Sequence, residues 1–364
     1  MILANFVGNL FYLLNCCVPK TSGKIIFNGF PDFEDMLRGL LPYLDGNIIV
    51  LVKEPNLVRP NWLPLQVEIV QKHSFMGFWH ILTSAEIYYT HGLFSFFRTI
   101  SSEKQFVVNL WHGMGLKNVG LLDGKKNMPQ SHKTICTSPF FQKVQAETFG
   151  MNLEDVLICG LPRNDILNKK TANTELIRIR EKYSKCYVWL PTYRKSGVGD
   201  IRIDGDTSSV FCFDDFDYIR LNILLVEKNE VLIIKPHPMA VLDKFNEELS
   251  NIKIISESWL TKNSTTLYEL LSVSDSLWTD YSSVFVDYLV TDKPIVFIAP
   301  DLELYKKSRG FSFDINEIQL PGISITTQDE FFDLAFKPPS QGSIKMNKEI
   351  FNTIRRYNDN LLRN

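Results

Sequence analysis

Short apolar runs alternate with longer amphipathic stretches along most of this chain. Two of the apolar runs lead directly into a histidine motif. Residues 106–110 precede Trp111-His112-Gly113, and residues 231–234 precede Lys235-Pro236-His237-Pro238. Short apolar runs bounded by Gly and Pro predict buried strands of a parallel sheet. Because ligands collect at the carboxyl ends of such strands, the pattern predicts two sheets that face one cleft.

The same alternation predicts the order of strands and helices. Strands are predicted at residues 24–30, 47–53, 67–71, 86–90, 105–110, 133–137, 156–159, 186–190, 231–235, 252–256, 276–279 and 295–299. Helices are predicted at residues 31–41, 140–149, 171–184, 216–228, 265–274, 283–290 and 345–362. Strand–helix alternation implies right-handed βαβ connections, so the expected fold class is α/β with parallel sheets.

Length and rhythm suggest two domains. The chain has 364 residues, which is long for one compact domain. The strand–helix rhythm restarts after a charged helical stretch that could bridge the two domains. We therefore expect an N-terminal helical segment over residues 1–20, a first Rossmann-like domain over 21–170 and a second over 171–340. A final helix within residues 341–364 is expected to pack back on the first domain.

Composition narrows the class of protein. A hydrophobic content of 45% permits a packed core, and a net charge of −2 gives no general attraction to nucleic acid. Six scattered cysteines without CxxC spacing predict neither a disulfide framework nor a zinc site. No apolar run is long enough to span a bilayer. The apolar residues 1–17 could form a helix on a membrane or on the protein itself. Docking on the protein is favoured, because Lys and Arg are absent before Lys20.

His112 is the candidate general base. It follows a predicted strand, and Gly113 and Gly115 allow the backbone to turn sharply and approach a ligand. A histidine with an ordinary pKa can take a proton from an attacking hydroxyl at neutral pH. The alternative is a loop histidine with structural contacts alone. His91, which also follows a strand and precedes a glycine, is a weaker echo of the same pattern.

Four other clusters offer groups that bind phosphate. Residues 235–238 present a cation and an imidazole on a proline-stiffened turn. Residues 279–283 precede an apolar helix, so Ser282 or Ser283 could cap a helix N-terminus that binds an anion. Arg194, within residues 191–194, could clamp a phosphate with two hydrogen bonds. The loop over residues 160–165 could be either a hinge or a ligand loop. Each cluster has a plain structural alternative, but together they suit a substrate with two phosphates.

Several common enzyme classes are disfavoured. The sequence lacks the GxSxG pattern of serine hydrolases, the P-loop and the GxGxxG fingerprint. These absences argue against a P-loop nucleotide hydrolase and a simple dehydrogenase. No cofactor is predicted with certainty, and a divalent metal requirement stays open because no strong carboxylate cluster is present.

In combination, the motifs resemble one family. In chain order they are residues 111–117, 160–165, 191–194, 235–238 and 279–283, then Asp287, Lys293-Pro294, Arg309-Gly310-Phe311 and Leu320-Pro321-Gly322. This series resembles the CDP-glycerol glycerophosphotransferase family, which builds teichoic acids and related capsule polymers. The resemblance covers residues 105–325, and it is specific because no single motif carries it. Tyr193 stands where many members carry Trp or Phe. The chain length is closer to a single catalytic unit than to the family's longer polymerases.

The resemblance implies a GT-B architecture, with two Rossmann-like domains around a central cleft. The first domain would serve the acceptor, and the second would bind a CDP-polyol. The donor implied is CDP-glycerol or CDP-ribitol, and the acceptor is a polyprenyl-linked saccharide or polyol phosphate. It also implies a cytoplasmic protein with peripheral contact at the inner face of the cell membrane and no nucleic-acid partner.

With this family in view, roles can be assigned to the candidate residues. An acceptor hydroxyl would attack the donor's β-phosphorus, and CMP would leave. His112 would be the base, and His237 would hydrogen-bond or protonate the leaving phosphate. The donor would be held by Arg194, Lys235, Thr279, Asp280, Ser282, Ser283 and Arg309. Acceptor or loop contacts are expected from Gly113, Lys117, Arg163 and Asn164.

Three other functions remain open at this stage. The closest alternative is a CDP-ribitol ribitolphosphotransferase with the same site. A sugar-nucleotide glycosyltransferase or epimerase of GT-B architecture would also place a diphosphate at helix N-termini of the second domain. A non-catalytic nucleotide-binding scaffold would keep the fold without turnover.

Overall fold

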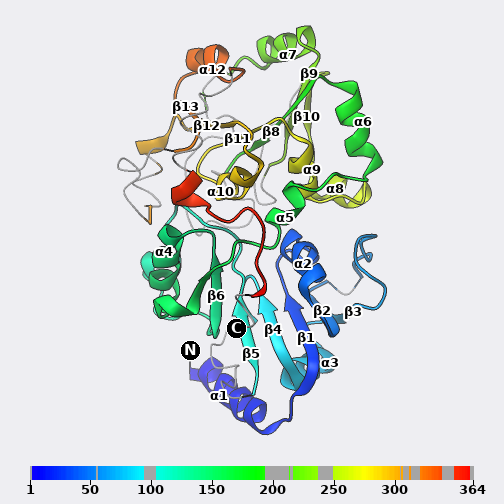
Figure 1. The fold of residues 1–364 in the computed structure, drawn as a ribbon, viewed down its shortest axis with the longest axis vertical. Helices are drawn as coiled ribbons and strands as arrows, with labels where there is room; N and C mark the ends of the chain where they lie inside the picture. Colours follow the sequence, from blue (N-terminus) through cyan, green and yellow to red (C-terminus); the bar gives the residue numbers. More distant parts are fainter. Residues whose placement is uncertain are drawn as a thin grey trace. The chain divides into compact units, whose positions relative to one another are not determined.

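The structure, a computed structural model, describes residues 2–54, 56–93, 104–192, 213, 216–236, 249–303, 305, 311–312, 320–337 and 348–360 (Figure 1). The chain forms two compact units. The first unit comprises Met1–Gly113, Val119–Asp165 and Thr353–Asn364, and the second comprises Met114–Asn118 and Ile166–Asn352. Each unit contains a parallel sheet with helices, which confirms the predicted α/β class.

The first unit is built on a seven-stranded parallel sheet in the order β3-β2-β1-β4-β5-β6-β7. Its strands are β1 (Thr21–Asn28), β2 (Asn47–Val52), β3 (Glu68–Gln71), β4 (Ser84–Tyr89), β5 (Phe106–Asn109), β6 (Lys133–Cys136) and β7 (Val156–Ile158). Its helices are α1 (Ile2–Cys17), α2 (Asp35–Leu40), α3 (Phe75–Thr83) and α4 (Pro139–Phe149), with 3₁₀ turns η1 (Leu41–Tyr43), η2 (Gly120–Asp123) and η3 (Leu153–Asp155). All seven predicted strands of this half are present, with ends shifted by a few residues.

Helix α1 is docked on this unit along one side only. Phe11 is buried in a cluster with Ile26, Ile81 and Val107, and its ring lies 5.9 Å from that of Phe78 in α3. The predicted docking of α1 on the protein is therefore confirmed for this side. Other apolar side chains of the helix are exposed, namely Phe6, Val7, Leu10, Leu13 and Leu14. Among the described residues, no helix is long and apolar enough to cross a membrane.

The second unit is built on a six-stranded parallel sheet in the order β10-β9-β8-β11-β12-β13. Its strands are β8 (Lys185–Leu190), β9 (Glu230–Ile234), β10 (Ile252–Ile254), β11 (Ser276–Thr279), β12 (Ile295–Ile298) and β13 (Ile323–Ile325). Its helical elements are α6 (Thr174–Lys182), α7 (Tyr218–Glu227), α8 (Glu257–Lys262), α9 (Leu267–Val273), α10 (Val284–Tyr288), η4 (Leu289–Thr291) and α12 (Gln328–Leu334). The sequence reading missed β13, whose three residues are too short to show a period.

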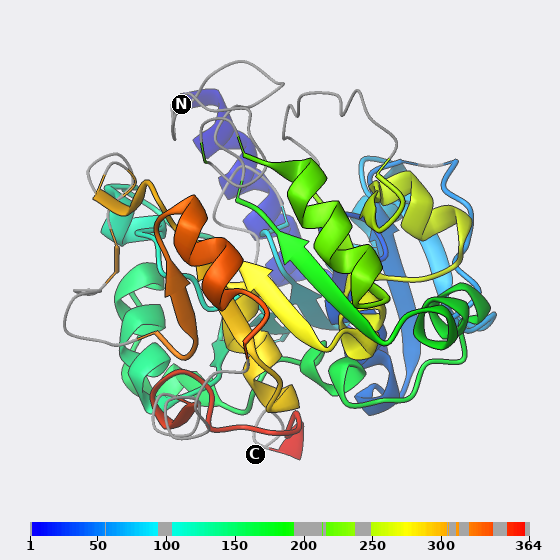
Figure 2. The ribbon, with the colours of Figure 1, turned by 90° about the horizontal axis from the view of Figure 1, so that it is seen from above.

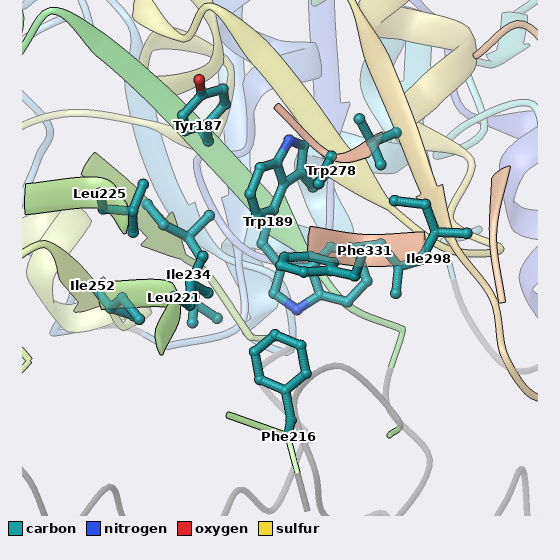
Figure 3. Packing of buried hydrophobic residues seen from close by; sticks show 14 of the residues in the cluster. Tyr187, Trp189, Phe216, Leu221, Leu225, Ile234, Ile252, Trp278, Ile298 and Phe331 are labelled. Atoms are coloured by element: carbon teal, nitrogen blue, oxygen red, sulfur yellow. The ribbon is translucent and has the colours of Figure 1, made fainter. Parts of the chain in front are cut away.

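Helices α7 and α12 cover one face of the second sheet (Figure 2). Trp189 and Trp278 on neighbouring strands are fully buried there, and Phe331 of α12 packs edge-on against Trp278 at 5.3 Å (Figure 3). Leu221 and Leu225 of α7 join the same cluster. Large aromatic side chains thus form much of the core on this face of the sheet.

The short helix α5 (Asn164–Leu167) carries the chain from the first unit into the second. The return passage lies between Asn352 and Thr353. The predicted helix over the tail is wrong there, since helix occupies 348–351 and residues 352–358 are not helical. The backbone N–H groups of Thr353 and Asn358 donate to Thr137 and Cys159 of the first unit. Tertiary hydrogen bonds therefore replace the helical ones.

Candidate functional site

The loop that carries His112 is held in a strained conformation. Strand β5 ends at Asn109, whose side-chain oxygen accepts a hydrogen bond from the Trp111 backbone N–H at 2.9 Å. Trp111 has a φ of 54° and Gly113 a φ of 138°. A bulky residue at positive φ costs about 1–3 kcal/mol and persists where the surroundings enforce it, often at functional sites. The predicted role of Gly113 in a sharp turn is consistent with this geometry.

The His112 ring packs against two other aromatic rings of the first unit. It stacks on His91 with the ring centroids 4.2 Å apart and an interplanar angle of 9°. The Trp111 ring lies 3.7 Å away at an angle of 39°. His91 follows strand β4 and His112 follows its neighbour β5, so parallel pairing brings the two imidazoles to the same edge of the sheet. His91, whose sequence pattern resembles that of His112 less fully, is thus a direct neighbour of the candidate base.

Arg163 holds the same loop through a hydrogen bond to its backbone. It is 8% exposed, and its Nη2 donates to the backbone oxygen of His112 at 3.2 Å. Asn164 is 2% exposed at the start of α5. Both residues were expected to contact the acceptor or the loop. Burial together with this hydrogen bond favours the loop contact for Arg163.

Thr90 and Glu34 form a chain of polar groups next to His91. The Thr90 hydroxyl donates to Glu34 Oε1 and lies 3.0 Å from His91 Nδ1. The Phe30 backbone N–H also donates to Glu34 Oε1, at 3.2 Å. Sequence analysis missed Glu34 and Thr90. The available signal was that Glu34 follows the end of β1, which lies next to β4 in the sheet.

The electrostatics of this cluster keep its imidazoles neutral. Burial, followed by the nearby His91 and Arg163, holds the pKa of His112 well below its ordinary value. Partial desolvation by the surrounding protein also lowers the pKa of His91, although its side chain is exposed in part, and Arg163 and Lys72 act in the same direction. Burial raises the pKa of Glu34 to about 7 despite the hydrogen bond from Thr90. A neutral His112 can accept a proton without first losing one, as a general base must.

In the second unit, Lys235 is a buried cation with a carboxylate partner. It follows β9, is 6% exposed, and its Nζ lies 2.7 Å from Glu257 Oε2 at the start of α8. The side chain of Glu257 is 52% exposed. An exposed carboxylate can turn away to water, which would leave the Lys235 ammonium free to bind an anion. Glu257 was not identified from the sequence.

Asp280 and Thr279 follow β11 at the same edge of this sheet. Both oxygens of Asp280 accept hydrogen bonds from the Thr192 backbone N–H, at 3.1 and 2.9 Å, and Oδ1 also accepts from the backbone N–H of Tyr281. Asp280 is 1% exposed, and Thr279 donates to the carbonyl of Leu190. The structure therefore favours a positioning role for both residues, in contrast to the predicted direct donor contact.

Ser282 and Ser283 lie half-buried before α10. Ser283 occupies the N-cap position, but within the described residues its side chain makes no capping hydrogen bond. Its hydroxyl is therefore not committed to the helix end. Helix α10 has only five residues before η4 begins, which is shorter than the helix predicted over 283–290.

Residues 114–118, although they follow His112 directly, group with the second unit. Lys117 pairs with Phe311 in an isolated antiparallel bridge, and its Nζ lies 5.3 Å from the centre of the Tyr305 ring. The Ser312 backbone N–H donates to Leu116 at 2.8 Å. Lys117 thus lies beside Phe311, the described residue of the motif at 309–311. Arg309 itself, Arg194 and His237 lie outside the described residues.

The structure brings the predicted residues together in two groups. His112, Gly113 and Arg163 gather at the carboxyl end of β5 in the first unit. Lys235, Thr279 and Asp280 gather at the carboxyl ends of β9 and β11, on either side of β8. The first group supplies a neutral imidazole, and the second supplies a cation with hydroxyl groups nearby.

Comparison with known proteins points to one family. The family model described as CDP-Glycerol:Poly(glycerophosphate) glycerophosphotransferase matches residues 10–359. A teichoic acid ribitol-phosphate primase of Bacillus spizizenii is 27% identical over 350 residues, covering 88% of this chain and 84% of the primase. A teichoic acid glycerol-phosphate transferase of Staphylococcus aureus is 27% identical over 64% of this chain and 62% of its own length. A structure of the wall teichoic acid polymerase TagF has the same fold, with a TM-score of 0.73 and 20% identity over 99% of this chain and 92% of that one.

Proposed function

Because the chain belongs to the CDP-glycerol:poly(glycerophosphate) glycerophosphotransferase family, we propose that His112 is the base of a polyol-phosphate transfer from a CDP-polyol. The family resemblance predicted from the motifs is confirmed, and with it the class of enzyme, a teichoic acid polyol-phosphate transferase. The observation that carries the assignment of the base is the environment of His112. It is a neutral imidazole at a strand end, on a strained loop that Arg163 supports.

The proposed reaction is a single displacement at phosphorus. An acceptor hydroxyl attacks the β-phosphorus of the CDP-polyol, a new P–O bond forms, and the bond to the oxygen of CMP breaks. The proton of the attacking hydroxyl moves to His112, and the electron pair of the broken bond leaves with CMP. General base catalysis of this kind contributes about 10²- to 10⁴-fold.

Charge stabilisation is assigned to the second unit. Lys235, with the hydroxyls of Ser282 and Ser283, would contact the diphosphate, while Asp280 and Thr279 fix the strand ends beneath. Preorganised charge is usually the larger contribution in phosphoryl transfer. From sequence alone, Arg194 and Arg309 are proposed to bind the same phosphates, and His237 is proposed to assist the leaving group.

The donor and acceptor are tested by the products. The enzyme would be incubated with CDP-glycerol or CDP-ribitol and a short polyprenyl-linked acceptor, and the products would be analysed by mass spectrometry. We expect CMP release with growth of the acceptor by one polyol phosphate. UDP-sugars in place of CDP-polyols serve as the control, because a glycosyltransferase would use them. Donor binding without any transfer, with every acceptor tried, would favour a non-catalytic scaffold.

We also propose peripheral membrane contact through an apolar face formed by α1 and α3. The exposed side chains of this α1–α3 face are Phe6, Leu10, Leu13, Leu14, Phe75, Met76 and Trp79. Phe75 is 82% exposed and Phe6 is 66% exposed. The two helices contact each other through Phe11 and Phe78. An aromatic-rich amphipathic surface of this kind inserts into the headgroup region of a bilayer.

Vesicle binding tests this contact. Sedimentation with phosphatidylglycerol vesicles should retain the protein, and the Leu13→Glu/Phe75→Glu double variant should lose most of this binding. Leu153→Glu is the matched control, since Leu153 is also an exposed leucine of the first unit but lies in η3. Equal binding by the double variant and the control would exclude the α1–α3 face.

A further inference from the structure

His91 and His112 are arranged as a pair around Thr90. The Thr90 hydroxyl lies 3.0 Å from Nδ1 of His91, and the Thr90 carbonyl lies 3.5 Å from Nδ1 of His112. The rings are almost parallel, with centroids 4.2 Å apart. Because both Nδ1 atoms face the same residue, both Nε2 atoms lie on the side of the rings away from it. The fully buried Thr90 thus orients two imidazoles at once.

The partners also fix where the ring protons lie. A carbonyl oxygen accepts only, so the contact with Thr90 places the His112 proton on Nδ1. The Thr90 hydroxyl donates to Glu34, so its oxygen is left to accept from Nδ1–H of His91. Each neutral ring then carries an unprotonated Nε2. His91 is exposed and His112 half-buried, so a ligand can reach the pair.

We propose that His91 and His112 form a paired acceptor site that binds two hydroxyls on neighbouring carbons of the acceptor substrate. This inference rests on the proposed function, and it defines the substrate class of that site as a vicinal diol. Parallel rings direct their Nε2 lone pairs side by side, so two hydroxyl donors are held about as far apart as the rings. A single metal ion would require the two lone pairs to converge.

The two imidazoles then have different tasks. His112 takes the proton of the hydroxyl that attacks phosphorus. His91 accepts a hydrogen bond from the neighbouring hydroxyl, which keeps its proton throughout. An acceptor that already ends in a glycerol or ribitol phosphate presents such a diol, whereas an acceptor with one isolated hydroxyl does not. His91 therefore contacts substrate, and Thr90 and Glu34 are positioning residues.

Removing one hydroxyl from the acceptor tests this pairing. A lipid-linked acceptor ending in glycerol 1-phosphate would be compared with the acceptor ending in 3-hydroxypropyl phosphate, which keeps the terminal hydroxyl and lacks its neighbour. We expect kcat/KM to be about tenfold lower for the second acceptor, as the loss of one hydrogen bond implies. In His91→Ala this preference should fall to about twofold or less. Partial recovery is expected in His91→Gln, whose amide oxygen can accept the same bond.

A matched pair at Thr90 tests the orientation. Thr90→Ser keeps the hydroxyl and should retain the preference for the diol acceptor. Thr90→Val removes the hydroxyl and should lose that preference. CMP release from the donor in the absence of acceptor, and thermal unfolding, report whether a variant is merely misfolded. Thermal unfolding should change little in His91→Ala, because the His91 side chain is exposed.

The outcomes separate the two levels of inference. If wild type uses both acceptors equally well, or if His91→Ala retains the tenfold preference, the paired site is wrong while the transfer reaction stands. If wild type transfers polyol phosphate to neither acceptor, the proposed function itself fails.

Discussion

The two units of this protein differ in the charge of the groups at their strand ends. In the first unit, His112 and His91 stack on each other, and burial favours their neutral forms. In the second unit, Lys235 is paired with Glu257 at 2.7 Å. The difference suggests a division of labour, in which one unit moves a proton and the other binds a dianionic group.

The largest effect is expected from His112→Ala. Loss of the base should lower the transfer rate by about 10²- to 10⁴-fold. Donor affinity, measured by calorimetry with CDP-glycerol, should change little, because the proposed donor contacts belong to the second unit. A variant that lost donor binding as strongly as turnover would contradict the division of labour.

Lys235 and Glu257 should affect the donor in opposite directions. Lys235→Met removes the cation and should weaken CDP-polyol binding by about 10- to 100-fold, the value of a charge-assisted hydrogen bond. Glu257→Gln removes the competing carboxylate and should strengthen binding by about threefold, since the half-exposed Glu257 side chain can leave the pair for water at little cost. Equilibrium binding measures both. Weaker binding in Glu257→Gln would show that the carboxylate supports the Lys235 ammonium instead of competing for it.

Asp280→Asn should act on stability more than on chemistry. Asp280 is buried and accepts hydrogen bonds from Thr192 and Tyr281, and an amide nitrogen cannot accept them. We expect a loss of about 1–3 kcal/mol in the free energy of unfolding. Denaturant titration measures it, and Asp329→Asn on α12 is a control from the same unit. An unchanged stability together with lost donor binding would restore the direct donor contact first predicted for Asp280.

The smallest effect concerns Glu34 and pH. Its pKa is raised to about 7 by burial, with Asp35 acting in the same direction and Thr90, Arg163 and the Phe30 N–H opposing it. The protonated Glu34 carboxyl therefore makes its full contribution to stability at about pH 4. That contribution is lost as the pH rises through 7. Glu34→Gln should remove this loss and raise stability at pH 8 by on the order of 1 kcal/mol, with little change at pH 4. A pH series of thermal unfolding would show whether the slope disappears.

The sequence predicted every strand of the two sheets except β13, because their apolar runs are short and bounded. It also located His112 and Lys235, since each ends such a run. It could not show that His91 stacks on His112, because that contact depends on the pairing of β4 with β5. Glu34 and Glu257 were missed for a similar reason. Each acquires its role from a partner on another strand, and no spacing along the chain records the partnership.

The tail shows the opposite case, in which the sequence predicts a helix that the structure lacks. Residues 345–362 carry a helical pattern, yet Thr353 and Asn358 donate their backbone N–H groups to the first unit. Tertiary hydrogen bonding overrode local preference, as short amphipathic segments allow.

The return of the chain to the first unit has a consequence for biosynthesis. Tyr357 donates its backbone N–H to Asp165, so the carboxylate that follows the Arg163 loop gains a partner from near the end of the sequence. On the ribosome, the sheet that carries His112 emerges well before residues 353–358, which complete its contacts. The strands of the second unit, within residues 185–325, are all translated in the interval. The first unit of a nascent chain is therefore completed only after the strands of the second unit have emerged.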